Sequence, residues 1–303
     1  MTATAVPLRF QVGARTLASV PRRLVRVALS LDDVLADRAP VLPPLPAGAH
    51  GYLVTSVPER QASAVAAAAG LLTMTRQRYT RYHVDLTMGF NAWQAQLSAN
   101  ARAGLRRKAR KLAAANGGVL EVERFACAAA MPHFHAAARQ VSAKTYQERL
   151  MDAGLPDTPA FRAEMAARAR TGTMRAWLLR VGETPIAYLY CPAAGSTLIY
   201  DRVGHDPAYG ELSPGAVLQV EALRDLMEEG RFRRFDFTEG EGQHKRQMAS
   251  GGTACVDLLL LRPTPANRLA LLALAAFDGA MARARRLGDH PALRGLAKRL
   301  RRG

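Results

Sequence analysis

The stretch that decides the fold covers residues 200–215 and reads YDRVGHDPAYGELSPG. It continues a predicted strand at 197–203, passes through a turn-rich loop, and ends where an amphipathic helix is expected over 215–229. Ser213 suits the N-cap of that helix, and Pro214 suits its first turn because the missing N–H would be unpaired there anyway. The remaining N–H groups and the helix dipole would bind a phosphate or pyrophosphate, and Gly215 leaves room for it. An ordinary capped helix without a ligand would show the same three residues.

Strand-like segments lie on both sides of this stretch. Segment 174–181 alternates, turns at 182–183 and returns over 185–190, which predicts a hairpin. Further strands are expected at 232–237 and 254–261, and Gly230 fits the end of the intervening helix. This order predicts a mixed α/β sheet with at least one crossover connection.

Helices are expected before the strands. Apolar residues recur near the helical period over 90–116, and two further helices are expected at 132–148 and 159–171. The helix expected over 90–116 is strongly basic and carries Arg102, Arg106, Arg107, Lys108, Arg110 and Lys111. Three interpretations stay open for these side chains: contact with the phosphates of a cofactor or a tRNA, binding of duplex nucleic acid, or a solvated face.

The chain before residue 86 contains short strand-like runs at 24–31, 51–57 and 79–86 and an Ala-rich helix at 61–72. The Pro-rich segment 40–46 is expected to be a surface loop. We therefore predict a small α/β unit at 1–85, a core domain at 86–262, and a basic, amphipathic helical tail at 263–303.

A second group of chemically capable residues follows a predicted strand, in the segment 233–245, which reads RRFDFTEGEGQHK. Asp236, Glu239 and His244 are candidate proton acceptors, and Lys245 is a candidate for binding an anionic substrate. Asp236 lies between two phenylalanines and projects to the face opposite them, so it could also be buried and paired for structural reasons alone.

The composition points to an anionic partner, because the formal net charge is +17. Part of that excess is arginine in an Ala/Arg/Leu-rich sequence, which is typical of a high-GC bacterial genome. The cysteines at 127, 191 and 255 include no CxxC pair, which favours a reducing compartment and gives no zinc ribbon. No signal peptide or spanning helix is visible, so we expect a cytoplasmic protein.

Two further features bear on partners. The tail combines an apolar stretch with a polybasic end, which is typical of a peripheral contact with anionic lipid, here at the inner membrane face. His133 and His135 look like half a metal site, but spacing of two residues in a helix sends their rings to different sides, and no metal is expected.

The ordered set of motifs resembles the GNAT-fold acetyltransferase-like domain found in cellulose-biosynthesis-associated proteins. It is more distantly similar to the peptidyltransferases that add amino acids to peptidoglycan precursors. The residues that carry the resemblance are 102–112, 182–187, 200–201, 206–209, 213–215, 235–237 and 240–245.

The resemblance implies an α/β (α+β) fold with a mainly antiparallel GNAT-like sheet flanked by helices, and a truncated second GNAT-like unit at the N-terminus. It places an acyl thioester between two splayed strands and the cofactor pyrophosphate at Pro214 and Gly215. The usual Arg/Gln-x-x-Gly-x-Gly/Ala phosphate loop is absent, so the donor stays open between acetyl-CoA or a longer acyl-CoA, an acyl carrier protein and a charged tRNA.

The implied reaction is direct attack of a substrate amine on the acyl carbonyl. Backbone N–H groups near Val203 and Gly204 would polarise that carbonyl, and Tyr209 would return a proton to the leaving thiolate. Four further residues are candidates for substrate binding, and they are Lys144, Tyr146, Tyr200 and Asp201. Two other functions stay open: aminoacyl transfer from tRNA to a cell-wall or lipid precursor, and non-catalytic binding of nucleic acid or anionic membrane.

Overall fold

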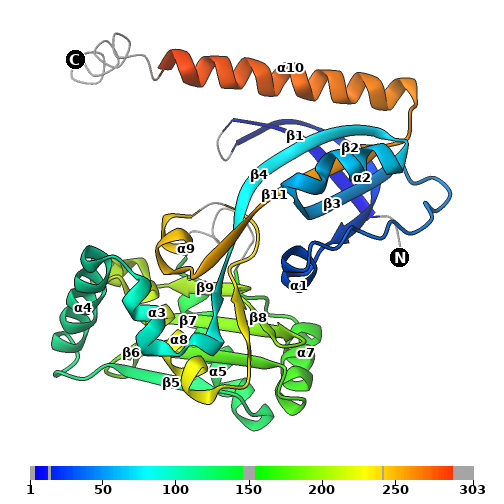
Figure 1. Cartoon of the computed structure of the whole chain (residues 1–303). Helices are drawn as coiled ribbons and strands as arrows, with labels where there is room; N and C mark the ends of the chain where they lie inside the picture. Colours follow the sequence, from blue (N-terminus) through cyan, green and yellow to red (C-terminus); the bar gives the residue numbers. More distant parts are fainter. Residues whose placement is uncertain (1–3, 13–14, 146–153, 241, 289–303) are drawn as a thin grey trace. The chain divides into compact units, whose positions relative to one another are not determined.

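The structure is a computed structural model that describes residues 4–12, 15–145, 154–240 and 242–288 (Figure 1). The chain divides into two compact units, of which the first comprises Met1–Arg78 and Ala254–Gly303 and the second comprises Tyr79–Thr253. The long strands β4 (Leu72–Asp85) and β11 (Gly251–Leu261) contribute residues to both units. We describe each unit by itself.

The first unit is a sheet with helices attached. Its strands are β1 (Thr4–Val12), β2 (Arg15–Ala28) and β3 (Gly51–Pro58), together with parts of β11 and β4, in the order β1-β2-β3-β11-β4. β1 and β2 are antiparallel, β2 and β3 are parallel, and β3 and β11 are antiparallel. The helices are α1 (Leu31–Leu35), η1 (Glu59–Gln61), α2 (Ala62–Ala69) and α10 (Pro265–Gly288).

The core of the first unit lies between its sheet and α10. Leu24 and Leu259 from the sheet are fully buried and pack with Ala270 and Leu274 of α10. Burying these side chains stabilises the unit by removing apolar surface from water. Among the described residues, every helix, α10 included, is too short or too polar to cross a bilayer.

The second unit contains most of the helices. Before its central strands lie η2 (Leu86–Met88), α3 (Phe90–Gln96), α4 (Ala99–Ala114), β5 (Glu121–Phe125), η3 (Ala128–Ala130), α5 (Met131–Ser142) and α7 (Pro159–Arg170). After these come β6 (Met174–Val181), β7 (Thr184–Ala194), β8 (Thr197–Ile199), β9 (Arg202–His205), η4 (Pro207–Leu212), α8 (Pro214–Glu229), β10 (Arg234–Asp236) and α9 (Gln243–Met248).

The sheet of the second unit is mixed and mainly antiparallel. Its order is β4-β10-β8-β7-β6-β5, and β9 also pairs with β7. The β8–β10 pair is parallel, and the pairs β5–β6, β6–β7, β7–β8, β7–β9 and β10–β4 are antiparallel. The parallel pair needs a crossover, and α8 supplies it, as the sequence predicts.

Both faces of this sheet are covered, which explains why β6 is apolar along most of its length. Trp177 and Leu179 of β6 join a core with residues of α3, α4 and α8, whereas Ala176 and Leu178 join a second core with residues of α5 and α7. Successive side chains on a strand point to opposite faces, so one strand serves two cores. The fold class predicted from the sequence is confirmed.

Two predicted elements are interrupted. The helix expected over 90–116 is two helices, because Leu97 is extended (φ −68°, ψ 145°) and Ser98 caps the second by accepting the N–H of Ala101 at 3.1 Å. The strand expected over 197–203 is divided into β8 and β9 around Tyr200 and Asp201. The second interruption shapes the site described below.

Candidate functional site

The ladder between β8 and β10 ends at one hydrogen bond. The N–H of Tyr200 donates to the carbonyl of Asp236 at 2.9 Å, directly after the paired residues Ile199 and Asp236. Beyond this point, the N–H of Phe237 donates to the carbonyl of Tyr82 in β4, while β9 continues along β7. The two neighbouring strands therefore separate after Tyr200.

The hydrogen-bonding pattern of β9 directs alternate N–H groups away from β7. The N–H of Asp206 donates to the carbonyl of Ile186 in β7 at 2.8 Å, and Gly204 lies opposite Tyr188 in the same register. Because pairs alternate in an antiparallel ladder, the N–H of Gly204 faces β7 and that of Val203 faces away from it. Of the two residues predicted to polarise a carbonyl, Val203 has the suitable orientation.

Helix α8 starts beside the end of β9. A Cβ built on Gly215 meets a single side-chain atom, Nδ1 of His205, at 3.8 Å. Among the described residues, the N–H of Gly215 has no acceptor, whereas the N–H groups of Ala216 and Val217 both donate to the carbonyl of Ser213. The start of α8 thus offers one unpaired N–H and space next to it, which suits an anion.

The predicted role of Ser213 as a side-chain N-cap is wrong. Its side chain makes no capping hydrogen bond, and its backbone is left-handed (φ 53°, ψ 49°) because the 3-10 helix η4 leads directly into α8. The N–H of Ser213 donates to the carbonyl of Gly210 at 2.9 Å. Its carbonyl, rather than its hydroxyl, therefore accepts the first N–H groups of α8.

Two lysines approach this region from other helices. Nζ of Lys144, just after α5, lies 2.7 Å from Oδ2 of the buried Asp206, and Nζ of Lys111 in α4 donates to the carbonyl of Glu211 at 3.0 Å. Burial alone would raise the pKa of Asp206, but the bond from Lys144, the N–H of Ala208 and the lysine charge together lower it. Asp206 is consequently a carboxylate that holds Lys144 beside β9.

Tight packing fixes the position of β9. A Cβ on Gly204 would lie 2.6 Å from Cε1 of Tyr188 and 3.0 Å from Cγ2 of Thr145. Both distances are shorter than ordinary van der Waals contact, and both Tyr188 and Thr145 are buried. Gly204 is therefore needed for close approach of β9 to these two side chains.

A buried ion pair lies at the end of β10. Nη2 of Arg81 is 2.6 Å from Oδ2 of Asp236, and Nε of Arg81 donates to Oδ1 at 3.2 Å. Oδ1 also accepts the N–H of Thr238 at 2.8 Å, and Thr238 has a positive φ of 62°. A β-branched residue rarely adopts this conformation, so the turn after β10 is held in place by the pair.

The other candidate residues of segment 233–245 are more exposed than Asp236. The ring of His244 in α9 lies 6.2 Å from that of Tyr200, and Tyr200 also packs edge-on against Phe235 and Phe237. Burial, and then the charge of Lys245, lower the pKa of His244 below its usual value, so its imidazole is neutral at neutral pH.

Lys245 of α9 contacts the loop that carries Glu239. Nζ of Lys245 donates to the carbonyl of Glu239 at 2.7 Å, so the lysine supports the turn that follows β10. Burial lowers the pKa of Arg81, but the bond and charge of Asp236 and, to a smaller extent, the charge of the exposed Glu239 raise it above its usual value.

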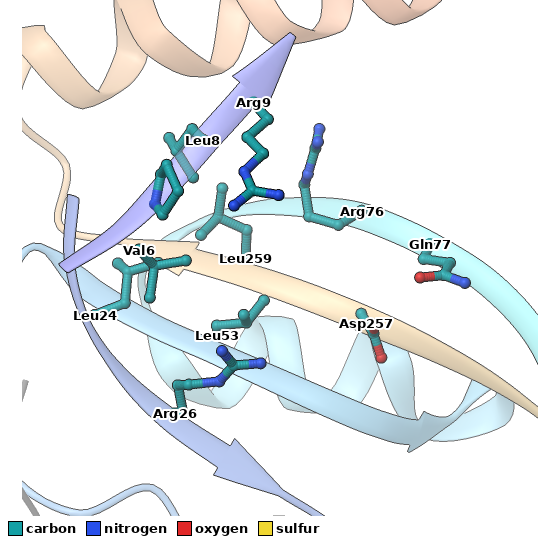
Figure 2. A pocket seen from close by; sticks show the side chains of 11 residues that line it. Val6, Leu8, Arg9, Leu24, Arg26, Leu53, Arg76, Gln77, Asp257 and Leu259 are labelled. Carbon is teal, nitrogen blue, oxygen red and sulfur yellow. The ribbon is translucent and has the colours of Figure 1, made fainter. Parts of the chain in front are cut away.

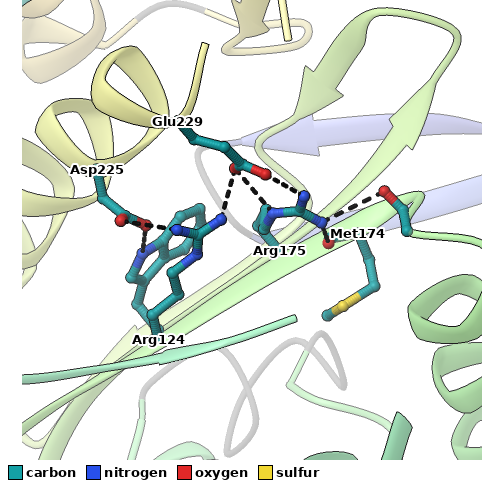
Figure 3. Close-up of polar contacts among 7 residues, drawn as sticks. Arg124, Met174, Arg175, Asp225 and Glu229 are labelled. Atoms are coloured by element: carbon teal, nitrogen blue, oxygen red, sulfur yellow. Dashed lines mark hydrogen bonds and ion pairs between the residues drawn. The ribbon is translucent and has the colours of Figure 1, made fainter. Parts of the chain in front are cut away.

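A network of charged side chains ties α8 to the sheet (Figure 3). Arg124 of β5 bonds Asp225 at 3.1 Å and Glu229 at 2.6 Å, and Nε of Arg175 in β6 donates to Glu229 at 2.9 Å. Nε1 of Trp177 donates to the second oxygen of Asp225 at 2.9 Å. These bonds hold the C-terminal half of α8 and thereby fix the direction in which its N-terminus points.

The structure thus brings the predicted site residues into two groups. The first surrounds the end of β9 and the start of α8, and it contains Lys144, Val203, Gly204, Tyr209, Ser213, Pro214 and Gly215. The second surrounds the end of β10, and it contains Tyr200, Asp236, Glu239, His244 and Lys245. The exposed Asp201 belongs to neither group; it follows Tyr200 in the interval between β8 and β9. Tyr146 lies outside the described residues.

Three contacts at the site were not predicted from the sequence. Arg81 and Asp206 bind the site residues Asp236 and Lys144, which are 155 and 62 positions away in the chain, and Lys111 donates to the carbonyl of Glu211, 100 positions away. Asp206-Pro207 at the start of a 3-10 helix is a recognisable cap, since Asp206 accepts the N–H of Ala208 at 3.0 Å, but nothing local marks the other two.

The histidines at 133 and 135 point to different partners. Nε2 of His135 lies 3.0 Å from the carbonyl of Pro156, whereas Nε2 of His133 lies 3.8 Å from Glu123. Within the part of the chain that the structure describes, no cluster of three or more His, Cys, Asp or Glu side chains is arranged to hold a metal ion.

Comparison with known proteins decides the family. The family model of the Acetyltransferase (GNAT) domain matches residues 99–246, which lie within the second unit. This segment is a GNAT acetyltransferase domain. No curated protein is similar enough in sequence to count as a relative of the chain.

Solved structures agree with the GNAT assignment at the level of the fold. The C-terminal domain of a candidate lysylphosphatidylglycerol synthetase from Agrobacterium fabrum is 16% identical over 75% of this chain and 72% of that chain, with a TM-score of 0.52. FemX is 10% identical over 90% of this chain and 91% of its own, with a TM-score of 0.50. In the GNAT domain, the separating strands are β8–β9 and β10, and α8 is the helix between them.

Proposed function

We propose that this chain is an N-acyltransferase that moves an acyl group from acyl-CoA, or from another phosphopantetheine thioester, to an amine by direct attack. The observation that carries the proposal is that the outward N–H of Val203 in β9 and the unpaired N–H of Gly215 at the start of α8 lie on two elements joined only by η4, beside the point where β9 and β10 separate. The N–H of Val203 can stabilise a developing oxyanion, and the N–H of Gly215 can bind a phosphate.

We propose that the residues around the end of β9 and the start of α8 bind the donor. Its pyrophosphate would lie at Gly215, where a Cβ would still leave space, and its pantetheine arm would run along the free edge of β9. The thioester carbonyl would then reach the N–H of Val203. Lys144 and Lys111 add positive charge near this path, although both already contact protein oxygen atoms.

We assign the proton acceptor to His244. Both oxygens of Asp236 are occupied by Arg81, and Asp236 is 1% exposed, so it is poorly placed to take up a proton from a substrate. The residue His244 is exposed to a substrate, and partial burial of its ring together with the charge of Lys245 lowers its pKa, which favours the neutral imidazole. Glu239 is the alternative acceptor, since it is also exposed, in the loop that leads into α9.

The steps balance without a cofactor beyond the donor. The amine nitrogen forms a bond to the carbonyl carbon, and one of its protons passes to His244. The carbon–sulfur bond then breaks, and the thiolate takes a proton from Tyr209, which belongs to η4 immediately before α8. His244 then gives its proton to water and the phenolate of Tyr209 takes one from water, so both residues return to their starting states. The exposed carboxylate of Asp201 and the ring of Tyr200 are candidates for holding the amine.

A second function is aminoacyl transfer from tRNA to a cell-wall or lipid precursor. The observations in its favour are the formal charge of +17 and the position of the basic helix α4, whose Lys111 reaches the loop directly before α8. Phosphates of a tRNA acceptor end could use that surface, since nucleic-acid binding is driven largely by contacts of Lys and Arg with phosphates.

Calorimetric titration of the full chain separates these functions. Saturable binding of acetyl-CoA or a longer acyl-CoA, lost in Gly215→Asp and kept in Gly215→Ala, supports the first. Salt-sensitive binding of tRNA without binding of acyl-CoA supports the second, and it requires aminoacyl transfer in a product assay to exclude a non-catalytic binder. Absence of binding to either donor contradicts the acyltransferase proposal.

A further inference from the structure

The first unit contains a pocket that the acyltransfer reaction does not use (Figure 2). Its volume is about 530 Å³, and its lining comes from β1, β2, β3, β4 and β11. Sites for small organic ligands typically measure roughly 300–1,000 Å³, so this pocket has the size of a ligand site. All of its lining residues belong to the first unit.

The floor of the pocket is apolar. Leu24, Leu53 and Leu259 come from neighbouring strands, and Leu53 lies directly opposite Leu259 in the β3–β11 register. Helix α10 covers an adjoining part of the same leucine cluster through Ala270 and Leu274. An apolar ligand placed on this floor would extend the cover that α10 provides.

The rim of the pocket is cationic. Arg76 is held by Asp278 of α10 at 3.1 Å. The side chains of Arg9 and Arg26 have no ion-pair or hydrogen-bond partner among the described residues. Figure 2 shows Arg9 and Arg26 reaching toward Leu259 and Leu53 from opposite sides. The acid in the lining, Asp257, accepts the N–H of Ser56 at 3.0 Å.

We propose that this pocket binds an amphipathic anion, in which a carboxylate or phosphate head is attached to an acyl chain or a similar apolar body. Two guanidinium groups without partners bind such heads in the bidentate manner that arginine favours. The apolar body would rest on the two lining side chains that are only partly buried, Val6 and Leu53, beside the fully buried Leu24 and Leu259. A purely polar anion would leave Val6 and Leu53 partly in water, and a neutral lipid would leave the two charges unused.

The test is calorimetric titration of the full chain with dodecanoate and with dodecyl phosphate, both below their micelle-forming concentrations. Arg9→Glu and Arg26→Glu each replace a positive charge of the rim by a negative one. Arg23→Glu is the matched control, because Arg23 lies on the same strand as Arg26 at an odd spacing and therefore on the opposite face. Thermal melts followed by circular dichroism check that each variant is folded.

We expect saturable binding of at least one of the two probes, which tells a carboxylate ligand from a phosphate ligand. Arg9→Glu and Arg26→Glu should each weaken it by about tenfold or more, since each reverses one charge at the head group, and Arg23→Glu should not. Equal binding of the uncharged dodecyl maltoside, unchanged binding in the two pocket variants, or no binding of either probe would overturn the proposal. None of these results depends on donor binding at Gly215.

Discussion

Arg81 donates to both carboxylate oxygens of Asp236, at 3.2 Å and 2.6 Å, and both side chains are almost completely buried. The pair joins β4 to β10, and the same carboxylate fixes the turn at Thr238. It therefore stabilises the end of the strand that is followed by the loop with Glu239 and by α9 with His244 and Lys245.

Asp236→Asn should destabilise the protein by about 3–5 kcal/mol, because it removes the buried carboxylate charge that pairs with the guanidinium of Arg81. Urea unfolding followed by circular dichroism measures this. The double variant Arg81→Leu with Asp236→Leu should recover most of the loss. Arg162→Ala, which removes an exposed ion pair with Asp157, is the control and should cost less than about 1 kcal/mol. A double variant no more stable than Asp236→Asn would contradict this account.

Gly215→Asp should weaken binding of acetyl-CoA by about tenfold or more, because a carboxylate would occupy the anion position at the start of α8. The protein should remain folded, since an acidic residue is favourable in the first turn of a helix. Gly215→Ala is the matched control, because its Cβ meets only Nδ1 of His205 at 3.8 Å. Equal affinities for the two variants would show that no anion binds there.

The pKa of His244 should rise toward its usual value when the charge of Lys245 is removed. NMR titration of the His244 ring proton follows this directly, with His244→Gln used to assign the signal. Lys245→Met should move the midpoint to higher pH, whereas Lys245→Arg, which keeps the charge, should leave it low. A wild-type midpoint at or above the usual value of 6.5 would remove the basis for assigning His244 as proton acceptor.

Glu229→Gln should make the second unit less stable by roughly 1–3 kcal/mol, because Arg124 and Arg175 lose a charged acceptor. Burial alone would raise the pKa of Glu229, but the two arginines hold it below its usual 4.5. Its stabilising contribution is therefore present above the unfolded pKa and disappears as the pH falls through the lower folded pKa. Urea unfolding at neutral pH and at acid pH should show that the difference between wild type and Glu229→Gln shrinks in acid.

The predicted contact with anionic lipid can be tested through α10. Leu269 and Leu272 are 70% and 68% exposed, and the basic tail that follows lies partly beyond the described residues. We expect the protein to sediment with phosphatidylglycerol vesicles at low salt and to do so less when both leucines are replaced by serine. Val41→Ser, at another exposed apolar residue, is the control. A wild-type protein that stays in the supernatant would exclude the contact.

The regular elements around the site were predictable because each is specified locally. The strand expected at 174–181 is β6, and the helix expected at 215–229 is α8, which ends at Gly230 in the left-handed conformation (φ 65°). In both segments, the alternation or helical spacing of apolar residues is complete within the segment itself. The periodic pattern over 90–116 misled only at Leu97 and Ser98, where apolar spacing continues across a break in the backbone.

The site was only partly predictable because its contacts join distant residues. Asp236 could be recognised as a buried acid from its position between two phenylalanines, but its partner Arg81 is 155 positions away and could not be identified. The cap at Ser213 failed because Ser213, the single residue between η4 and α8, is left-handed, which local residue preferences do not reveal. The orientation of the Val203 N–H depends on the register with β7 and is likewise a property of the folded sheet.

Gly204 limits how this site can diversify. Since even a methyl group at this position would collide with Tyr188 and Thr145, β9 cannot be shifted or bent to suit a larger donor. Changes in substrate range among descendants of this sequence should therefore accumulate in η4 and in the loop after β10, where glycines at 210 and 240 have open space around them. β9 itself would keep its sequence and position while these neighbouring segments vary.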